Sequence, residues 1–237
     1  ITYGLGRGAE VRAVDVNVES SGSAFTAVWP GGSLPIALKL AGNFNVYNAL
    51  AAIAFALGEG IEPAIIKQGL ERVAGVPGRF ESVACGQDFT VIVDYAHTPD
   101  GLKNILQTAQ RMARGRIITV FGCGGDRDRG KRPLMGEIAA RYSDFTIVTS
   151  DNPRTEEPMA IIEDILPGVN RVKDCSYAVV VDRREAIRQA VSMAAKDDIV
   201  IIAGKGHETY QLVKGEVFPF DDREVAREFL RGRWRNE

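Results

Sequence analysis

The sequence contains few of the residues that form disulfides or metal sites. Among its 237 residues there are only three cysteines and two histidines. Cys85, Cys123 and Cys175 are an odd number of widely spaced thiols, which matches neither a disulfide framework nor a zinc-binding spacing. His97 and His207 are too few for a histidine-rich metal site. We therefore expect free thiols in a reducing cytoplasm, and no metal site within this chain.

An excess of one charge and a long apolar run are also missing. Lys plus Arg number 29 and Asp plus Glu number 31, which gives a formal net charge of −2. This balance gives no reason to expect a nucleic acid or an acidic membrane as a partner. No apolar run is long enough to span a bilayer, and no signal-peptide pattern is present. We expect a monomer that acts on small molecules, and, because the sequence opens at Ile1 in a strand-like phrase, a natural start further upstream.

Two regions of different pattern follow one another along the chain. Residues 10–40 contain partly alternating apolar runs separated by turns, which predicts β-strands, and two helical patterns follow up to residue 72. Glycine and proline then crowd together at residues 74–78, as is typical of a linker. We therefore place a first domain at residues 1–75 and a second at residues 76–237.

The second region alternates short apolar runs with helical patterns. This alternation predicts an α/β fold with a Rossmann-like, doubly wound and mostly parallel sheet. The expected strands are 90–93, 117–121, 145–149, 178–181 and 199–203, and the expected helices are 102–113, 133–141, 159–165, 184–195 and 223–231. Ligands of such sheets bind beyond the carboxyl ends of the strands. The residues that follow the strands are therefore the candidates for a site.

A glycine-rich, charged loop occupies residues 122–132, between a strand and a helix. Glycines permit close approach to a ligand, and a helix N-terminus favours anions. The Gly-x-Gly-x-x-Gly spacing of a dinucleotide site is not met, because Asp126 and Arg127 interrupt it. The broken spacing weakens the alternative of a nicotinamide-dependent oxidoreductase. The loop either binds an anion or is a solvated loop whose Asp and Arg side chains pair with one another.

Residues 150–154, with the sequence Ser-Asp-Asn-Pro-Arg, follow the next strand. Pro153 disfavours a helical conformation in the residue before it and stiffens the loop, so Arg154 is presented from a rigid support. A guanidinium held in this way suits bidentate recognition of a carboxylate. In the alternative interpretation this segment only begins a helix, and Arg154 pairs with one of its acids, Glu156 or Glu157.

Residues 204–208, with the sequence Gly-Lys-Gly-His-Glu, follow the last strand. They do not form a P-loop, because no Ser or Thr comes after a Gly-Lys pair. Glu208 either accepts hydrogen bonds from a substrate ammonium group or belongs to a turn without a ligand.

A third group of polar residues has side chains of the kinds that bind a nucleotide. Arg79 follows the linker and would lie near phosphates, and Asp94 follows a strand and would accept ribose hydroxyls. His97 stands three residues later, where a structural role is commoner than a catalytic one. Asn45 and Asn48 open the first long helix, and their amides either read an adenine edge or cap the helix.

Taken in order, five phrases of the sequence resemble the Mur ligase family. They are GNFNVYNA at 42–49, GRFE at 78–81, DYAHTP at 94–99, FGCGGDRD at 121–128 and GKGHE at 204–208. The resemblance covers nearly the whole chain and is strongest for the members that attach the third peptide residue. It implies that ATP phosphorylates the D-glutamate carboxylate of UDP-N-acetylmuramoyl-L-alanyl-D-glutamate. An amino acid's amine then attacks the acyl phosphate.

The resemblance also implies a role for each candidate residue. Residues 151–154 resemble the form that accepts meso-diaminopimelate rather than L-lysine. Arg154, helped by Asn152, would then pair the distal carboxylate of this amino acid, within a loop completed by Asp151 and Pro153. Gly204 and Glu208 would bind the distal ammonium group, and Arg127 would bind the carboxylate beside the attacking amine. For the nucleotide, Asn45 and Asn48 would contact adenine, Arg79 the phosphates and Asp94 the ribose, with His97 beside it.

The sequence departs from the family by what it does not contain. Family members carry an N-terminal UDP-binding domain, a glycine-rich phosphate loop, and magnesium ligands that accompany a carbamylated lysine. None of these is present here, so residues 1–75 would be the last part of a central ATP-binding domain. The resemblance implies ATP and Mg²⁺ as cofactors, but we expect that these 237 residues alone do not turn over ATP. The alternatives are an L-lysine-adding relative and a non-catalytic amino-acid-binding module.

Overall fold

The computed structural model describes residues 1–19 and 22–233 of the chain. By its internal contacts the chain forms two compact units, Ile1–Val76 and Pro77–Glu237, and each has its own core. Within the described residues, every helix is too short or too polar to cross a membrane.

The first unit is a four-stranded sheet with two helices. Its strands lie in the order β1 (Tyr3–Gly4), β2 (Val11–Glu19), β3 (Gly22–Trp29) and β4 (Gly32–Leu38), with β1 parallel to β2 and the other pairs antiparallel. Helices α1 (Asn43–Gly58) and α2 (Pro63–Arg72) follow. The two helices pack on one face of the sheet, so alternate side chains of β2, β3 and β4 are buried there. The core between sheet and helices includes Phe25, Ile36, Leu50 and Ile53.

The second unit is built on a six-stranded sheet. The strand order is β5-β6-β10-β7-β8-β9, with bounds Glu81–Ser82, Thr90–Asp94, Ile199–Ala203, Ile117–Phe121, Phe145–Val148 and Tyr177–Val179. All neighbours are parallel except β5, which pairs antiparallel with β6. The central strands β10 and β7 are buried along their whole length. Such strands can only be accommodated when helices cover both faces.

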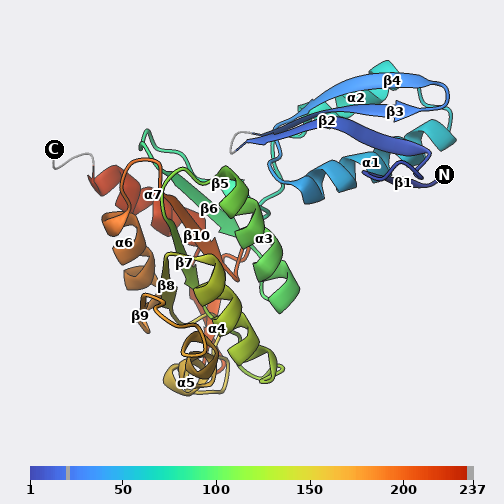
Figure 1. Cartoon of the computed structure of the whole chain (residues 1–237). Helices are drawn as coiled ribbons and strands as arrows, with labels where there is room; N and C mark the ends of the chain where they lie inside the picture. Colours follow the sequence, from blue (N-terminus) through green and yellow to red (C-terminus); the bar gives the residue numbers. More distant parts are fainter. Residues whose placement is uncertain (20–21, 234–237) are drawn as a thin grey trace. The chain divides into compact units, whose positions relative to one another are not determined.

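Five helices cover this sheet. Helices α3 (Pro99–Met112), α4 (Lys131–Tyr142) and α5 (Pro158–Val169) lie on one face, and α6 (Arg183–Met193) and α7 (Asp222–Arg233) lie on the other (Figure 1). On the second face, Ile187 and Val191 of α6 and Leu230 of α7 are buried in one core with the strands. The doubly wound sheet predicted from the sequence is confirmed, and its helices and strands lie close to the predicted ranges.

The sequence pattern did not predict a hairpin that lies between β10 and α7. Strands β11 (Tyr210–Val213) and β12 (Glu216–Pro219) pair antiparallel. The two residues between them, Lys214 and Gly215, have φ of 51° and 84°, as a tight two-residue turn requires. The side chains of β12 are all exposed, so a buried apolar pattern could not reveal this strand. The hairpin matters because β11 packs on the loop that contains Arg154.

Candidate functional site

Three loops leave the second unit's sheet side by side at its carboxyl edge. Strands β10, β7 and β8 are in register, with Ala203 opposite Phe121 and Phe121 opposite Val148. A Cβ on Gly122 would lie only 2.3 Å from the carbonyl oxygen of Thr149, so a glycine is required for this close approach. The loops that meet here are β7–α4 (residues 122–130), β8–α5 (149–157) and β10–β11 (204–209).

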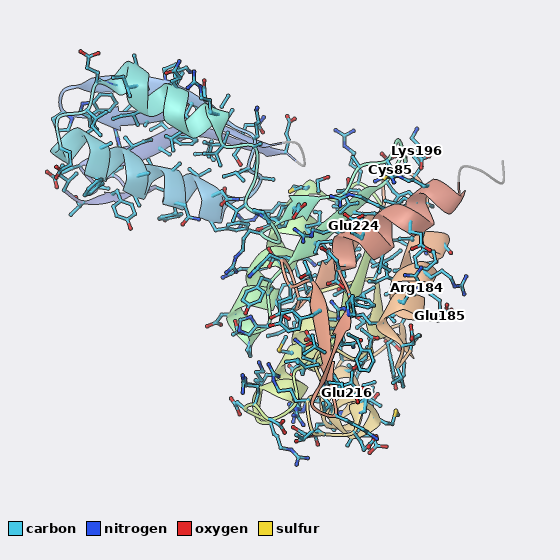
Figure 2. The ribbon with its side chains drawn as sticks, turned by 180° about the vertical axis from the view of Figure 1, so that it is seen from behind. Cys85, Arg184, Glu185, Lys196, Glu216 and Glu224 are labelled. Atoms are coloured by element: carbon cyan, nitrogen blue, oxygen red, sulfur yellow. The ribbon has the colours of Figure 1, made fainter. Side chains whose placement is uncertain are left out.

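The two ends of the second unit can be located in Figure 2. Lys196, which precedes β10, and Cys85 lie at one end, and Glu216, in the hairpin that follows β10, lies at the other. The carboxyl edge of the sheet is on the side of the hairpin. The labelled residues of α6, Arg184 and Glu185, lie between these ends.

Arg154 is fixed by both its backbone and its side chain. Its φ is 54°, its N–H donates to the carbonyl of Leu212 at 2.9 Å, and its own carbonyl accepts from the N–H of Lys214 at 2.6 Å. The guanidinium Nη1 donates to the carbonyl of Gly125 at 2.8 Å. The rigid presentation expected from the proline therefore has a second source, which is the pairing of Arg154 with the hairpin.

Arg154 does not pair with the acids that follow it. Glu156 binds Arg132 at 2.7 Å, and Glu157 binds Lys214 at 2.9 Å. Across residues 1–19 and 22–233 no carboxylate forms an ion pair with the half-buried Arg154. A guanidinium that is partly withdrawn from water without a counter-ion favours an anionic ligand.

Asn152 and Glu208 come together in the structure. Asn152 is 3% exposed, and its Nδ2 donates to Oε2 of Glu208 at 2.8 Å. Its Oδ1 accepts from the N–H of Leu212 at 3.0 Å and from Nζ of Lys205 at 3.0 Å. Sequence reasoning did not single out Lys205 as a site residue. The only feature of the sequence that indicated a role was its position between two glycines in a loop after a strand, and many exposed turns share that pattern.

The glycine-rich loop is tied to the β8–α5 loop by reciprocal bonds. The N–H of Asp126 donates to Oε1 of Glu156 at 2.6 Å, and Oδ1 of Asp126 accepts from the hydroxyl of Thr155 at 2.7 Å. The buried Arg132 also donates to Glu156, and mainly this bond lowers the pKa of Glu156 to about 2. A Cβ on Gly125 would lie 1.9 Å from the carbonyl oxygen of Pro153. The two loops are therefore joined both by hydrogen bonds and by a close contact of their backbones.

These contacts bear on the self-paired interpretation of the glycine-rich loop, whereas its binding of an anion stays a prediction. Its Asp and Arg side chains do not pair with each other in the described part of the chain, since Asp126 binds Thr155 and Arg129 binds Asp164. The space made by Gly125 is filled by protein backbone and not open to a dinucleotide. Arg127 is exposed, and its Nη1 donates to the carbonyl of Asp126 at 3.0 Å.

Gly204 begins the third loop and lies against Asp151. Its φ is 123°, and a Cβ there would lie 2.5 Å from Oδ2 of Asp151. Beneath both residues Arg183 is fully buried and donates to the carbonyls of Ala203 at 3.0 Å and Ser150 at 3.4 Å. A buried cation thus joins the ends of β10 and β8 directly below the candidate site.

The candidate nucleotide residues of the second unit come from the segment before β5, the end of β6 and the β6–α3 loop. Asp94 is buried and its oxygens accept from the N–H groups of Phe80 at 2.6 Å and Ala96 at 2.7 Å, while burial raises its pKa. Arg79 lies over the ring of Tyr95 at 4.8 Å, and the ring of His97 is 4.6 Å from the same tyrosine. Asp94 therefore has a structural role, and its contact with ribose stays a prediction.

The candidate adenine residues belong to the first unit. Asn45 is buried, with Nδ2 donating to the carbonyl of Ala41 at 2.8 Å, and Asn48 is exposed and donates to Oδ1 of Asn45 at 3.4 Å. Neither side chain caps α1, which begins after Gly42 without a side-chain cap. Among the described residues of both units, no group of three His, Cys, Asp or Glu side chains is arranged to hold a metal ion.

Each of the two units contains residues that match a model of a known protein family. Residues 78–206 match the family model of the Mur ligase glutamate ligase domain, and residues 1–56 match that of the Mur ligase middle domain. The first match covers more than half of the chain. The chain belongs to the Mur ligase family, as its sequence phrases indicated.

The chain is similar to particular members of this family. It is 60% identical over 232 residues to the UDP-N-acetylmuramoyl-L-alanyl-D-glutamate–2,6-diaminopimelate ligase of Syntrophomonas wolfei, covering 98% of this chain and 47% of that protein. It is 50% identical over 237 residues to the ligase of the same name from Bacillus cereus, covering 100% of this chain and 48% of that protein. The chain thus spans about half the length of the curated relatives it matches.

Solved structures give the same result for the fold. A structure of a UDP-N-acetylmuramoyl-L-alanyl-D-glutamate–2,6-diaminopimelate ligase superposes with a TM-score of 0.72 at 38% identity, covering 99% of this chain and 48% of that one. The UDP-N-acetylmuramate-alanine ligase of Thermotoga maritima superposes with a TM-score of 0.69 at 21% identity, covering 100% and 48%. The second likeness concerns the fold alone.

Proposed function

We propose that the carboxyl edge of the second unit accepts meso-2,6-diaminopimelate, as the amino-acid site of an ATP-dependent ligase. In the proposed reaction, ATP phosphorylates the D-glutamate carboxylate of UDP-N-acetylmuramoyl-L-alanyl-D-glutamate and ADP leaves. The amine of diaminopimelate then attacks the acyl carbon, an amide bond forms and phosphate is released. The names of the relatives support the choice of substrates.

The observation that carries the proposal is the guanidinium of Arg154, which forms no ion pair with any carboxylate of the described residues. Diaminopimelate differs from lysine by a carboxylate on the distal carbon, and a planar guanidinium can bind that group through two parallel hydrogen bonds. With lysine bound, this partly desolvated cation would have no counter-ion. The cost is on the order of 2–4 kcal/mol, or roughly 30- to 1000-fold in discrimination.

The distal part of the proposed site also contains an acid, Glu208. Glu208 and the neighbourhood of Gly204 suit the distal ammonium group, because Glu208 keeps 18% of its side chain exposed and lies beside Asn152. Arg127 belongs to the neighbouring glycine-rich loop and is exposed, and we assign to it the carboxylate next to the attacking amine. The distal end of the ligand would thus meet a cation and an anion in a fixed arrangement.

We further propose that Asn45, Asn48, Arg79 and Asp94 bind ATP, with His97 as a neighbour. The first unit would be the carboxy-terminal part of a central ATP-binding domain and the second the amino-acid-binding domain. No residue of this chain is assigned to Mg²⁺, which the reaction would need to neutralise the phosphates. We expect the protein to work as a cytoplasmic monomer on small molecules.

Calorimetric titration of the 237-residue chain tests the amino-acid site. Meso-diaminopimelate and L-lysine are titrated into the unmodified chain and into Arg154→Ala. Only diaminopimelate should bind the unmodified chain, and the substitution should remove that preference. Equal affinity of the unmodified chain for both amino acids would refute the assignment. An L-lysine-adding ligase would show the reverse preference.

A further inference from the structure

Lys205 is a charged side chain that is completely withdrawn from water. Its exposure is 0%, and its ammonium lies near the two polar residues assigned above to the distal end of the amino acid. Nζ is 3.0 Å from Oδ1 of Asn152 and 3.3 Å from Oε2 of Glu208. It also lies 5.7 Å from the centre of the Tyr210 ring. Burying an ammonium group is costly unless its partners compensate for the lost water.

The chain conformation around Lys205 directs this side chain inward. Gly204 and Gly206 on either side have φ of 123° and 55°. A Cβ on Gly206 would lie 2.6 Å from Cβ of Tyr95. The turn is therefore possible only with glycine on both sides of the lysine.

Building on the proposed function, we propose that Lys205 is a positioning residue that orients Asn152 and Glu208 toward the distal end of the bound amino acid. The first part of the argument concerns the amide of Asn152. Its Oδ1 faces two donors, Nζ of Lys205 and the N–H of Leu212. Turning the amide over would place its NH₂ group against both donors. Nδ2 must therefore point to Glu208.

The second part concerns the carboxylate of Glu208. Its Oε2 accepts from both Nδ2 of Asn152 and Nζ of Lys205, while Oε1 has no hydrogen bond among residues 1–19 and 22–233. One oxygen is thus held by protein, and the other is left for a ligand's ammonium group. Removing Lys205 frees both the amide and the carboxylate to turn.

The test compares two ligands on Lys205→Met and Lys205→Gln. Meso-diaminopimelate carries the distal ammonium group, and 2-aminopimelate lacks it and keeps the distal carboxylate. In the unmodified chain diaminopimelate should bind about tenfold or more tightly than 2-aminopimelate, as is typical of one hydrogen bond to a charged group. In both variants this ratio should fall toward one. A merely structural role of Lys205 would weaken the two ligands equally and leave the ratio unchanged.

A ligand-free measurement keeps the inference testable by itself. In ¹H–¹⁵N spectra of Lys205→Met, the side-chain NH₂ signals of Asn152 should shift and the amide proton of Leu212 should exchange faster with solvent. Lys196→Met is the matched control, since Lys196 is exposed at the opposite end of the sheet (Figure 2), and it should change neither ligand ratio nor spectrum.

The possible failures are distinguishable. If the unmodified chain binds no diaminopimelate, the proposed function is wrong, and the spectra still decide whether Lys205 orients Asn152. If the unmodified chain shows the expected ratio and both Lys205 variants retain it with unchanged Asn152 signals, the role of Lys205 is wrong. Lys205→Gln retains a hydrogen-bond donor without the charge, so it provides a second variant if Lys205→Met does not fold.

Discussion

Nη1 of Arg154 donates to the carbonyl oxygen of Gly125 at 2.8 Å, so a cation of the β8–α5 loop rests on the backbone of the β7–α4 loop. A Cβ on Gly124 would lie 2.8 Å from the same nitrogen. The glycines thus provide both the acceptor and the room for the guanidinium. Within the described chain, Nε and Nη2 of Arg154 form no hydrogen bond, and both stay available to a carboxylate.

Replacing Arg154 by lysine tests whether the positive charge of this side chain or the planar shape of its guanidinium recognises the ligand. A lysine ammonium keeps the positive charge but cannot hold the carbonyl of Gly125 and also present two parallel N–H groups. We expect Arg154→Lys to bind meso-diaminopimelate about 10- to 100-fold more weakly, by calorimetry, as loss of charged hydrogen bonds predicts. Arg114→Lys, an exposed arginine without an ion pair in the described residues, is the control. Unchanged affinity in Arg154→Lys would show that net charge alone recognises the ligand.

A methyl group at Gly125 should disrupt the contact between the two loops. The added Cβ would lie 1.9 Å from the carbonyl oxygen of Pro153, and because this neighbour is backbone it leaves little room for relaxation. We expect Gly125→Ala to lose about 1–3 kcal/mol of unfolding free energy, measured by urea denaturation, together with affinity for diaminopimelate. Gly130→Ala should be tolerated, because its φ is −62° and the nearest atom is the end of the Asp128 side chain. Equal stability of the two variants would contradict this account.

The sequence predicted the sheet and the loops at its carboxyl edge better than it predicted the contacts between those loops. Strands β7 and β10 were predictable because each is a short, fully buried and almost wholly apolar run. The parallel direction of β8 and β10 then placed Asn152, Arg154 and Glu208 at one edge of the sheet without any further knowledge. The burial of Lys205 was not predictable, because it depends on Asn152, which lies 53 positions away in the sequence.

The same limit explains the interpretations of Arg154 that the sequence left open. Local spacing alone made Glu156 a reasonable partner, since the two residues stand close together just before the same helix. The structure pairs Glu156 with Arg132, from a helix that follows a different strand. Only the three-dimensional arrangement of α4 and α5 shows which acid neutralises which arginine.

The pairing of Glu156 with Arg132 predicts a pH dependence of stability. The carboxyl has a folded-state pKa of about 2, against an ordinary value of 4.5. Between these values the unfolded chain binds more protons than the folded one, so this contribution is complete above pH 4.5 and is lost as the pH falls toward 2. Glu156→Gln should therefore lower the free energy of unfolding by about 1–3 kcal/mol at pH 7.

Urea denaturation at several pH values measures this difference. The difference in unfolding free energy between Glu156→Gln and the unmodified chain should become smaller as the pH falls below 4.5. Glu163→Gln, an exposed position of α5 with no ion pair among the described residues, should leave stability nearly unchanged at every pH. A gap that persists unchanged down to pH 2 would rule out the ion pair as its source.

Replacing only one residue of the buried pair Arg183 and Asp222 should lower the free energy of unfolding far more than replacing both. Both side chains have 0% exposure, and they are joined by two hydrogen bonds of 2.8 Å. Arg183→Met leaves an uncompensated carboxylate in the core, at a cost of about 3–5 kcal/mol. It also removes the donors to Ala203 and Ser150 that join β10 and β8 below the site.

Combining Arg183→Met with Asp222→Leu removes both charges together, so much of the unfolding free energy should return. Affinity for diaminopimelate should not return with it, because the two strand ends lose the cation that connects them. Urea denaturation and calorimetry of both single variants and the double variant measure these effects separately. If the double variant recovers affinity as fully as stability, Arg183 contributes to folding alone, and the position of the rim loops does not depend on it.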